Sequence, residues 1–444
     1  MPARLHLFAR IAPSLAGLAA LFVVMGLWLG GVHSAYDDLL RFWGIVPFQF
    51  PFADIDGSLA AWDCARRGVD IIISDPCDIL KRPYNYSPFW MTIDWIPLGS
   101  ADRVGVGLAL GTGFLVSLSA LPPPLSATEM VLRIAAVLST MVVFAIERAN
   151  PDMLIFILVI LMLSLLRRSL IARLLAYCIA FLAGAIKYYP FILLSLIVRE
   201  RIRVLFPAVI AAIIGLLFFF HIYAVQILEG LPSIASGLPF GDMFGDKNFL
   251  FGIVLVVRHI TGSSNYAANA AIAATMLLIM VLVWGEVKLW SRSNLPAALY
   301  RLDERCRLAL FAGVLLLLGC FFSGQSVGYR GIFLLLVLPG LFALGRDDAA
   351  GWAASAARWA AFSVPPLMWA EALRFWIHLA VSGHYPPPGF ISVLDQPFDF
   401  LVWCVREIVW WCLMSLFLTI LVGFLAGTPS FRILSENIWT RWKT

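Results

Sequence analysis

The polar stretch at residues 51–90, directly after the first apolar segment, holds the first side chains that could do chemistry. The candidates are Asp54, Asp56, Lys81, Arg82, Tyr84 and Tyr86. A positioned carboxylate can take a proton from a hydroxyl group, and lysine and arginine bind anionic oxygens. Tyrosine rings either stack on a ligand or anchor the chain at a membrane interface. Because a plain connector needs few such residues, this stretch is predicted to bind a ligand, although Asp54 could instead cap a helix.

Three more polar groups interrupt apolar segments: Lys187 with Tyr189 in LAGAIKYYPF, Asn150 in ERANPD, and Tyr329 with Arg330 in SGQSVGYRG. An ionisable side chain at membrane depth costs about 2.5–3.5 kcal/mol and is a functional hypothesis by default. The short apolar runs on either side of Lys187 predict a chain break that turns this side chain toward a cavity. Glycines around Arg330 would let the backbone approach a ligand. The alternatives are snorkelling for the two cations and an ordinary turn around Asn150.

The amino-acid composition indicates what kind of secondary structure positions these residues. Of the 444 residues, 61% are hydrophobic and only 13% are charged, and the mean hydropathy is +0.89. Soluble domains carry roughly 25% charged residues. The chain is therefore expected to be an all-α membrane protein that crosses the bilayer many times, and no nucleic-acid partner is expected. Residues 11–30 are interpreted as a retained first span, because this run is longer than the core of a signal peptide.

Apolar segments of spanning length predict the membrane crossings. The longer ones are 11–30, 103–121, 128–147, 204–222, 268–287, 307–322, 352–380 and 400–424. The shorter ones are 151–166, 170–186, 188–198 and 331–344. If every segment crosses, residues 1–444 form a single integral-membrane domain with about 12 transmembrane helices.

Basic residues assign the loops to the two faces of the membrane. With the N-terminus inside, every cluster of arginine and lysine falls on the cytoplasmic side. The opposite, extracytoplasmic face receives the long loops 31–102, 223–267 and 382–399. Within the first of these loops we expect a short amphipathic helix at 55–67 that lies on the membrane surface. Cys64 and Cys77 share that loop and either form a disulfide or stay unpaired.

The order of these motifs resembles the GT-C superfamily of integral-membrane glycosyltransferases, and most closely the polyprenol-phosphate-mannose-dependent alpha-mannosyltransferases. Asp54 is followed by the small-residue stretch SLAAWDCARRG and then by the aromatic-Pro element YNYSPFW. The segment Lys187-Tyr188-Tyr189-Pro190 matches the Lys-x-x-Pro of that family, whereas RANPD matches its Gly-Gln/Asn turn only loosely, without the glycine. The resemblance covers mainly residues 1–200, and beyond them it rests on topology and on Tyr329-Arg330.

The resemblance implies a GT-C-like bundle that transfers a mannose-like hexose or a pentose from a polyprenyl-phosphate donor to a lipid or glycan acceptor. It implies Asp54 as the general base, with Asp56 as the rival. The expected phosphate partners are Lys187, Arg330, Arg82 and Lys81. The expected substrate contacts are Tyr84, Tyr86, Asn150, Tyr189 and Tyr329. No metal or other cofactor is expected, because cationic side chains would stabilise the departing phosphate.

Other classes of protein would show different patterns. A lipid or small-solute transporter or flippase would carry polar residues through the depth of the bilayer, whereas here they gather toward one face. A polymerase or ligase acting on lipid-linked oligosaccharides would carry a larger outer loop late in the chain. An inert scaffold would leave Asp54 and Lys187 without a role. The expected location is the inner (plasma) membrane, with the site on its extracytoplasmic face.

Overall fold

The computed structural model describes residues 3–71, 75–230, 237, 239–385 and 397–428. These residues form helices almost throughout, apart from one antiparallel ladder in which β1 (Met243–Phe244) pairs with β2 (Ser326–Val327). The all-α prediction is confirmed. Most of the predicted loop 382–399 lies outside the described residues. The chain separates into two compact units, and the prediction of a single membrane domain stays a prediction.

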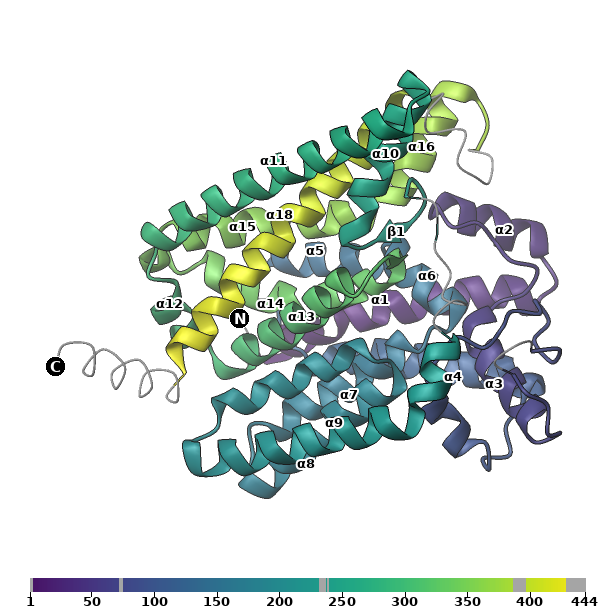
Figure 1. Ribbon diagram of the computed structural model, residues 1–444, viewed down its shortest axis with the longest axis horizontal. Coiled ribbons are helices and arrows are strands. Elements are labelled where there is room, and N and C mark those ends of the chain that lie inside the picture. Colours follow the sequence, from purple (N-terminus) through teal and green to yellow (C-terminus); the bar gives the residue numbers. More distant parts are fainter. Residues whose placement is uncertain (1–2, 72–74, 231–236, 238, 386–396, 429–444) are drawn as a thin grey trace. The chain divides into compact units, whose positions relative to one another are not determined.

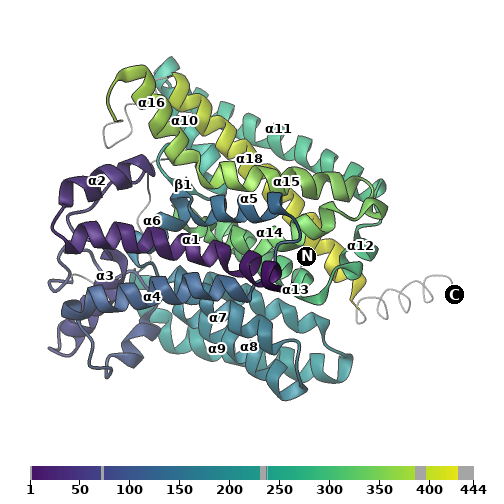
Figure 2. The ribbon, with the colours of Figure 1, turned by 180° about the vertical axis from the view of Figure 1, so that it is seen from behind.

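One unit, called here the Asp54 unit, comprises Gln49–Ala120, Ala145–Ala235 and Val422–Thr444. Its elements are α3 (Ala53–Ala65), η1 (Pro88–Ile93), η2 (Ser100–Asp102), α4 (Arg103–Ser117), η3 (Leu118–Ala120), the end of α6 (Thr140–Arg148), α7 (Asp152–Leu165), α8 (Leu170–Ile186), η4 (Tyr189–Arg199) and α9 (Ile202–Gly230). Helix α7 packs against α8, and α4 lies along α7 (Figure 2). The start of α8 is fixed by Ser169, whose hydroxyl accepts a hydrogen bond from the backbone N–H of Ala172 at 3.4 Å.

The second unit comprises Met1–Phe48, Leu121–Phe144 and Ser236–Leu421. Besides β1, β2 and the start of α6, its elements are α1 (Ala3–Leu29), α2 (His33–Phe42), α5 (Ala127–Val137), α10 (Asp246–Thr261), α11 (Ser264–Ser291), α12 (Leu295–Arg301), α13 (Glu304–Phe322), η6 (Gly328–Phe333), α14 (Leu334–Gly345), η7 (Asp348–Ala350), α15 (Trp352–Met368), α16 (Ala370–Ser382) and most of α18 (Pro397–Gly427). Helices α13 and α14 are apolar on every face and form the core. Figure 1 shows α11 and α18 side by side, where the hydroxyl of Ser415 donates to Glu286 at 2.8 Å.

Fewer of the described helices have the length and hydropathy of a membrane span than the sequence predicts. Within the described residues, seven helices are long and apolar enough to cross a bilayer, or eight if the bent pair α5 and α6 is one span. Helices α7 and α8 and the 3₁₀ helix η4 are apolar but shorter. A polytopic membrane protein is therefore confirmed in outline, and the number twelve is not. The predicted span 352–380 divides into α15 and α16, because Pro365 and Pro366 remove two backbone donors shortly before α15 ends.

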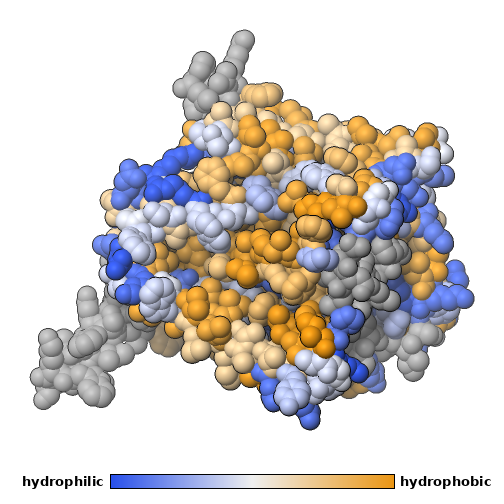
Figure 3. Space-filling model, turned by 90° about the horizontal axis from the view of Figure 1, so that it is seen from above, coloured by the Kyte–Doolittle hydropathy of each residue, from blue (hydrophilic) through white to orange (hydrophobic). Residues whose placement is uncertain are grey.

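Two long helices present apolar side chains outward. In both α9 and α11 only 6% of the most apolar window is buried within the protein. Exposed side chains on them include Leu217, Phe218, Met280 and Trp284. Apolar side chains also cover much of the face shown in Figure 3. A helix that is apolar all round and not buried by protein is suited to contact lipid.

The short helix predicted at 55–67 forms as α3, but it is largely buried within the protein and is not an amphipathic helix at the surface. Nine of its 13 residues are buried. Small residues on several faces allow neighbouring segments to approach closely, and Trp62 donates a hydrogen bond to the carbonyl of Trp90 at 2.9 Å. The amphipathic helix of this region is instead α2, which buries Tyr36 and Leu40 on one face.

Candidate functional site

Asp54 lies in the first turn of α3 and is positioned by the residue directly before this helix. Phe52 is fully buried and adopts a left-handed backbone conformation, with φ of 65°. Its N–H donates to the carbonyl of Glu147 at 2.6 Å. Its ring packs so closely on Gly107 that a side chain there would collide with it. Asp54 is therefore held on a buried anchor, and the helix-cap alternative fails because its carboxylate is bound to other side chains.

Asn150 connects Asp54 to Lys187 and Asp152, and these residues with Tyr189 and Arg82 are called here the cluster. Its side-chain N–H donates to Oδ2 of Asp54 at 2.6 Å. Its Oδ1 accepts from Nζ of Lys187 at 3.0 Å and from the backbone N–H of Asp152 at 3.0 Å. Because both donors require the oxygen on their side, the orientation of the amide is determined, and its N–H group must face Asp54.

The turn that presents Asn150 is made by an unusual residue. Helix α6 ends at Arg148, and Ala149 then adopts φ of 47°. The left-handed region costs a residue with a Cβ roughly 1–2 kcal/mol, and glycine is the usual occupant. Ala149 is therefore a strained residue directly before Asn150.

Lys187 ends α8 in extended conformation, as the predicted chain break requires. Its Nζ lies 2.7 Å from Oδ1 of Asp152, and the hydroxyl of Tyr189 donates to the same oxygen at 2.7 Å. Lys187 is 9% exposed and Asp152 is fully buried. Nζ also lies 5.7 Å from the centre of the Tyr86 ring, within cation–π range. Lys187 is therefore part of a buried charge pair and does not snorkel.

Arg82 approaches Asp54 from the other side. Its NH1 lies 3.7 Å from Oδ1 of Asp54, while Nε contacts Asp78 at 2.7 Å and NH2 donates to the carbonyl of Ala53 at 2.7 Å. Burial opposes the charge on Arg82, but Asp78 and Asp54 raise its pKa above the ordinary value. Lys81 is exposed, and its ammonium group has no partner among the described residues.

A disulfide holds the segment that carries Arg82. Cys64, near the end of α3, is bonded to Cys77, with Cα atoms 5.8 Å apart. The turn after Cys77 is fixed by Asp75, whose carboxylate accepts from the N–H of Cys77 at 3.1 Å and from that of Asp78 at 3.3 Å. Of the two alternatives left open by the sequence, the structure shows the paired cysteines.

Asp56 has a different environment from Asp54. It is fully buried, and its Oδ1 lies 3.4 Å from NH1 of Arg103. Its Oδ2 has no hydrogen-bond partner among the described residues. Burial raises the pKa of Asp56, although Arg103 opposes this shift. A carboxylate enclosed in this way offers no exposed oxygen to a substrate.

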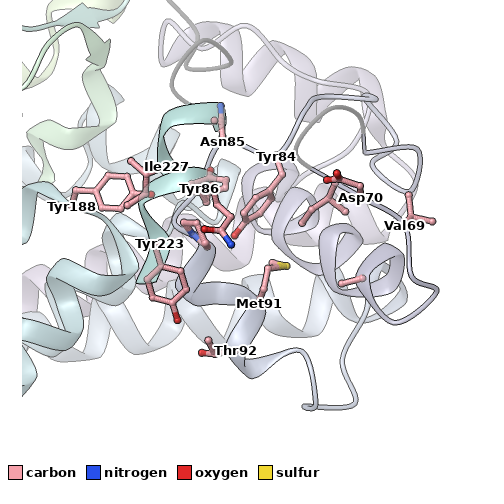
Figure 4. Close-up of a pocket in the computed structure, with 15 residues that line it drawn as sticks. Val69, Asp70, Tyr84, Asn85, Tyr86, Met91, Thr92, Tyr188, Tyr223 and Ile227 are labelled. Carbon is pink, nitrogen blue, oxygen red and sulfur yellow. The ribbon is translucent and has the colours of Figure 1, made fainter. Parts of the chain in front are cut away.

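The tyrosines at 84 and 86 line a pocket in the same unit (Figure 4). Tyr84 is buried, and its hydroxyl donates to the carbonyl of Ser87 at 3.2 Å. The ring of Tyr86 belongs both to the pocket and to the surroundings of Lys187.

Tyr329 and Arg330 belong to the second unit, on η6. Tyr329 packs edge-on against Phe144, with ring centres 5.6 Å apart. The sequence predicted that the nearby glycines let the backbone approach a ligand, but the structure shows them packed against side chains of the protein. A side chain at Gly328 would collide with Asp242, and one at Gly331 would collide with Met141. Close packing within the protein therefore explains these two glycines without a ligand.

The second unit also contains a buried polar cluster that the sequence did not suggest. Arg406, on α18, forms ion pairs with Glu371 and, at 3.1 Å, with Glu407. The side-chain N–H of Asn248 donates to Glu407 at 2.7 Å, and that of Gln325 donates to Asn248 at 3.1 Å. The adjacent Arg and Glu inside the apolar segment 400–424 are the signal that could have identified this cluster.

The structure therefore brings together Asp54, Asn150, Lys187, Tyr189 and Arg82 within one unit. The site residues predicted from the sequence did not include Asp152 and Asp78, the acids that pair with Lys187 and Arg82. Fold and site define an all-α, polytopic membrane protein with a cluster of acids, cations and amides beside a tyrosine-lined pocket. No protein-family model, curated protein or solved structure matches the chain.

Proposed function

We propose that this protein is a membrane glycosyltransferase that moves a sugar from a polyprenyl-phosphate donor to a hydroxyl group of a lipid or glycan acceptor. One observation carries the proposal: the carboxylate of Asp54 is oriented by Asn150, flanked by Arg82 and still 14% exposed. The rival base, Asp56, is fully buried. Asp54 is thus the acid that a substrate can reach.

In the proposed reaction, the acceptor oxygen attacks the anomeric carbon of the sugar while Asp54 takes the hydroxyl proton. A new carbon–oxygen bond forms, and the bond between the anomeric carbon and the phosphate oxygen breaks. Its electron pair leaves with the polyprenyl phosphate, so atoms and charge balance without an oxidant or reductant. A positioned general base contributes about 10²- to 10⁴-fold to the rate.

The cations have different parts in this proposal. The side chain of Arg82 is 36% exposed, and its neighbour Lys81 is exposed and has no partner among the described residues. These two are suited to receive the donor phosphate. Both Arg82 and Lys187 are paired with an acid, but Arg82 is partly exposed whereas Lys187 is buried with Asp152. We therefore assign Lys187 to positioning Asn150, and through it Asp54.

The location of the site is part of the proposal. Disulfides persist in oxidising compartments, so the bond between Cys64 and Cys77 supports an extracytoplasmic position for loop 31–102. The distribution of basic residues supports the same orientation. On this basis we propose a GT-C-like bundle in the plasma membrane, in which the shorter apolar helices α7 and α8 also enter the bilayer.

The test uses purified protein in lipid nanodiscs with a panel of radiolabelled polyprenyl-phosphate sugars and a membrane lipid extract. We expect transfer of at least one sugar to an extractable product. Asp54→Asn keeps the shape and should lower turnover by about two to four orders of magnitude, while donor binding is retained. Asp63→Asn is the matched control, because this acid lies on the same helix, is 27% exposed and pairs with Arg66.

Two results would overturn the proposal. Normal transfer by Asp54→Asn would remove the base from the site. Absence of transfer from every donor, together with movement of an intact donor across the bilayer, would identify the protein as a flippase.

A further inference from the structure

The pocket beside the cluster has a volume of about 320 Å³. Its walls come from the end of α3, the segments 69–71 and 84–86, η1, Tyr188 and the last two turns of α9 (Figure 4). Small-molecule sites are usually clefts of about 300–1,000 Å³ with aromatic walls and a few polar groups. The size and composition of this pocket fit that description at its lower end.

The charges around the pocket argue against a phosphate. None of its lining residues is lysine or arginine, and Asp70 is the one aspartate or glutamate among them. A phosphate group prefers arginine, lysine or a helix N-terminus. The cations of this unit that are suited to phosphate, Arg82 and Lys81, do not line the pocket. The pocket is therefore not suited to a phosphate group or another anion.

The polar groups argue against a purely apolar ligand. Figure 4 shows Tyr84, Tyr86 and Tyr223 around the pocket and Thr92 below them, and Gln226 is among the other polar residues of the lining. A hydrocarbon chain would cover the exposed amide of Gln226 without offering it a hydrogen bond, and it would cover the hydroxyl oxygen of Thr92, whose proton is donated to the carbonyl of Phe89 at 2.7 Å and which can still accept. Each hydrogen bond to water lost in this way costs about 1–3 kcal/mol. A sugar ring offers hydroxyl groups to these two residues and C–H groups to the electron-rich faces of the tyrosines.

We propose that this pocket binds one uncharged sugar ring, stacked on Tyr223 and hydrogen-bonded by Thr92 and Gln226. The inference rests on the proposed function, because Tyr86 links the pocket to the cluster that contains Lys187. The ring is either the sugar carried by the donor or a sugar of a glycan acceptor, and both have the same recognition chemistry.

The experiment measures binding of p-nitrophenyl α-mannopyranoside and the matching pentopyranosides by saturation-transfer NMR. The protein is held in nanodiscs free of glycoside detergents, because those detergents carry sugars themselves. We expect at least one glycoside to bind, and Tyr223→Ala and Gln226→Leu each to weaken its binding about tenfold, equivalent to about 1.4 kcal/mol. Tyr266→Ala is the matched control, since this tyrosine of α11 is 71% exposed and does not line the pocket.

Competition identifies the source of the sugar. Displacement of the glycoside by a sugar-bearing polyprenyl phosphate, but not by polyprenyl phosphate alone, supports the donor sugar. Simultaneous binding of glycoside and donor supports an acceptor glycan. Displacement by inorganic phosphate or by farnesol overturns the proposal, and so does glycoside binding that Tyr223→Ala and Gln226→Leu leave unchanged.

The same assay separates this inference from the proposed function. Asp54→Asn should bind the glycoside as the unsubstituted protein does. Glycoside binding without any sugar transfer would refute the proposed reaction and leave the pocket assignment intact. Sugar transfer without a glycoside that binds would refute the pocket assignment alone.

Discussion

Lys187→Met tests how the cluster works, because methionine keeps much of the length of lysine but removes its charge. In the structure, Nζ contacts Asp152 at 2.7 Å and Asn150 at 3.0 Å. The substitution therefore removes the counter-charge of Asp152 and one of the two donors that orient the amide of Asn150. We expect two separate effects, one on stability and one on turnover.

The size of the stability effect follows from burial. Lys187 is 9% exposed and Asp152 is fully buried. Breaking a buried ion pair by removing one partner costs about 3–5 kcal/mol, whereas an exposed pair is worth about 0–1 kcal/mol. The double variant Lys187→Met/Asp152→Asn leaves no uncompensated charge and should recover most of the loss.

The assay combines unfolding of the unsubstituted protein, Lys187→Met and the double variant in nanodiscs with turnover and donor affinity. If Lys187 acts through Asn150, the double variant should be stable, bind donor within about threefold of the unsubstituted protein, which is below 1 kcal/mol, and turn over slowly. A stable double variant that loses tenfold or more in donor affinity would show that Lys187 binds the phosphate directly. A loss below about 1 kcal/mol in Lys187→Met would refute the buried pair.

Three further predictions concern topology, backbone strain and pH. An impermeant maleimide should label a cysteine at the exposed position Asn85 in intact cells, and one at Arg201 only after lysis; the reverse pattern would invert the topology. Ala149→Gly should raise the free energy of unfolding by up to about 1 kcal/mol, because it relieves the left-handed conformation at φ of 47°, and a loss of that size would contradict this account. Burial and the neighbouring Glu371 raise the pKa of Asp242 from 3.8 to about 7, so the folded state gains stability from this group at low pH and loses it as the pH rises from 4 toward 7. Asp242→Asn should therefore raise the unfolding temperature more at pH 8 than at pH 5, and an equal effect at both would refute the assignment.

The part of the site that the sequence could predict depends on local signals. Two apolar runs too short to span, with a lysine and Pro190 between them, indicated the break that the structure places at Lys187. Its partner Asp152 lies 35 residues earlier in the chain, and no periodic pattern encodes a pairing over that distance. For the same reason the sequence listed Arg82 as a phosphate partner but did not identify Asp78 as the acid that holds it.

The errors in the fold have a similar origin. Hydropathy identifies how apolar a segment is, but it does not show whether lipid or protein surrounds that segment. It gave the same signal for α9, which is largely exposed, and for α13, which is largely buried. In α3 the helical spacing of Ile55, Leu59 and Trp62 suggested an amphipathic helix at a surface, but the small residues between them allow close packing on several sides. This packing depends on neighbours that a single helix pattern does not contain.

The backbone supplies an argument for the site that is independent of the resemblance. In the described part of the chain, three residues other than glycine have a positive φ: Phe52, Lys81 and Ala149. Each lies within two residues of a side chain in the cluster, namely Asp54, Arg82 or Asn150. Such conformations cost about 1–3 kcal/mol each and persist where the surrounding structure demands them, which is most often at functional sites. Because the strained positions come from three separate segments that meet around one carboxylate, the fold maintains this geometry at a cost, as a site for binding or catalysis would require.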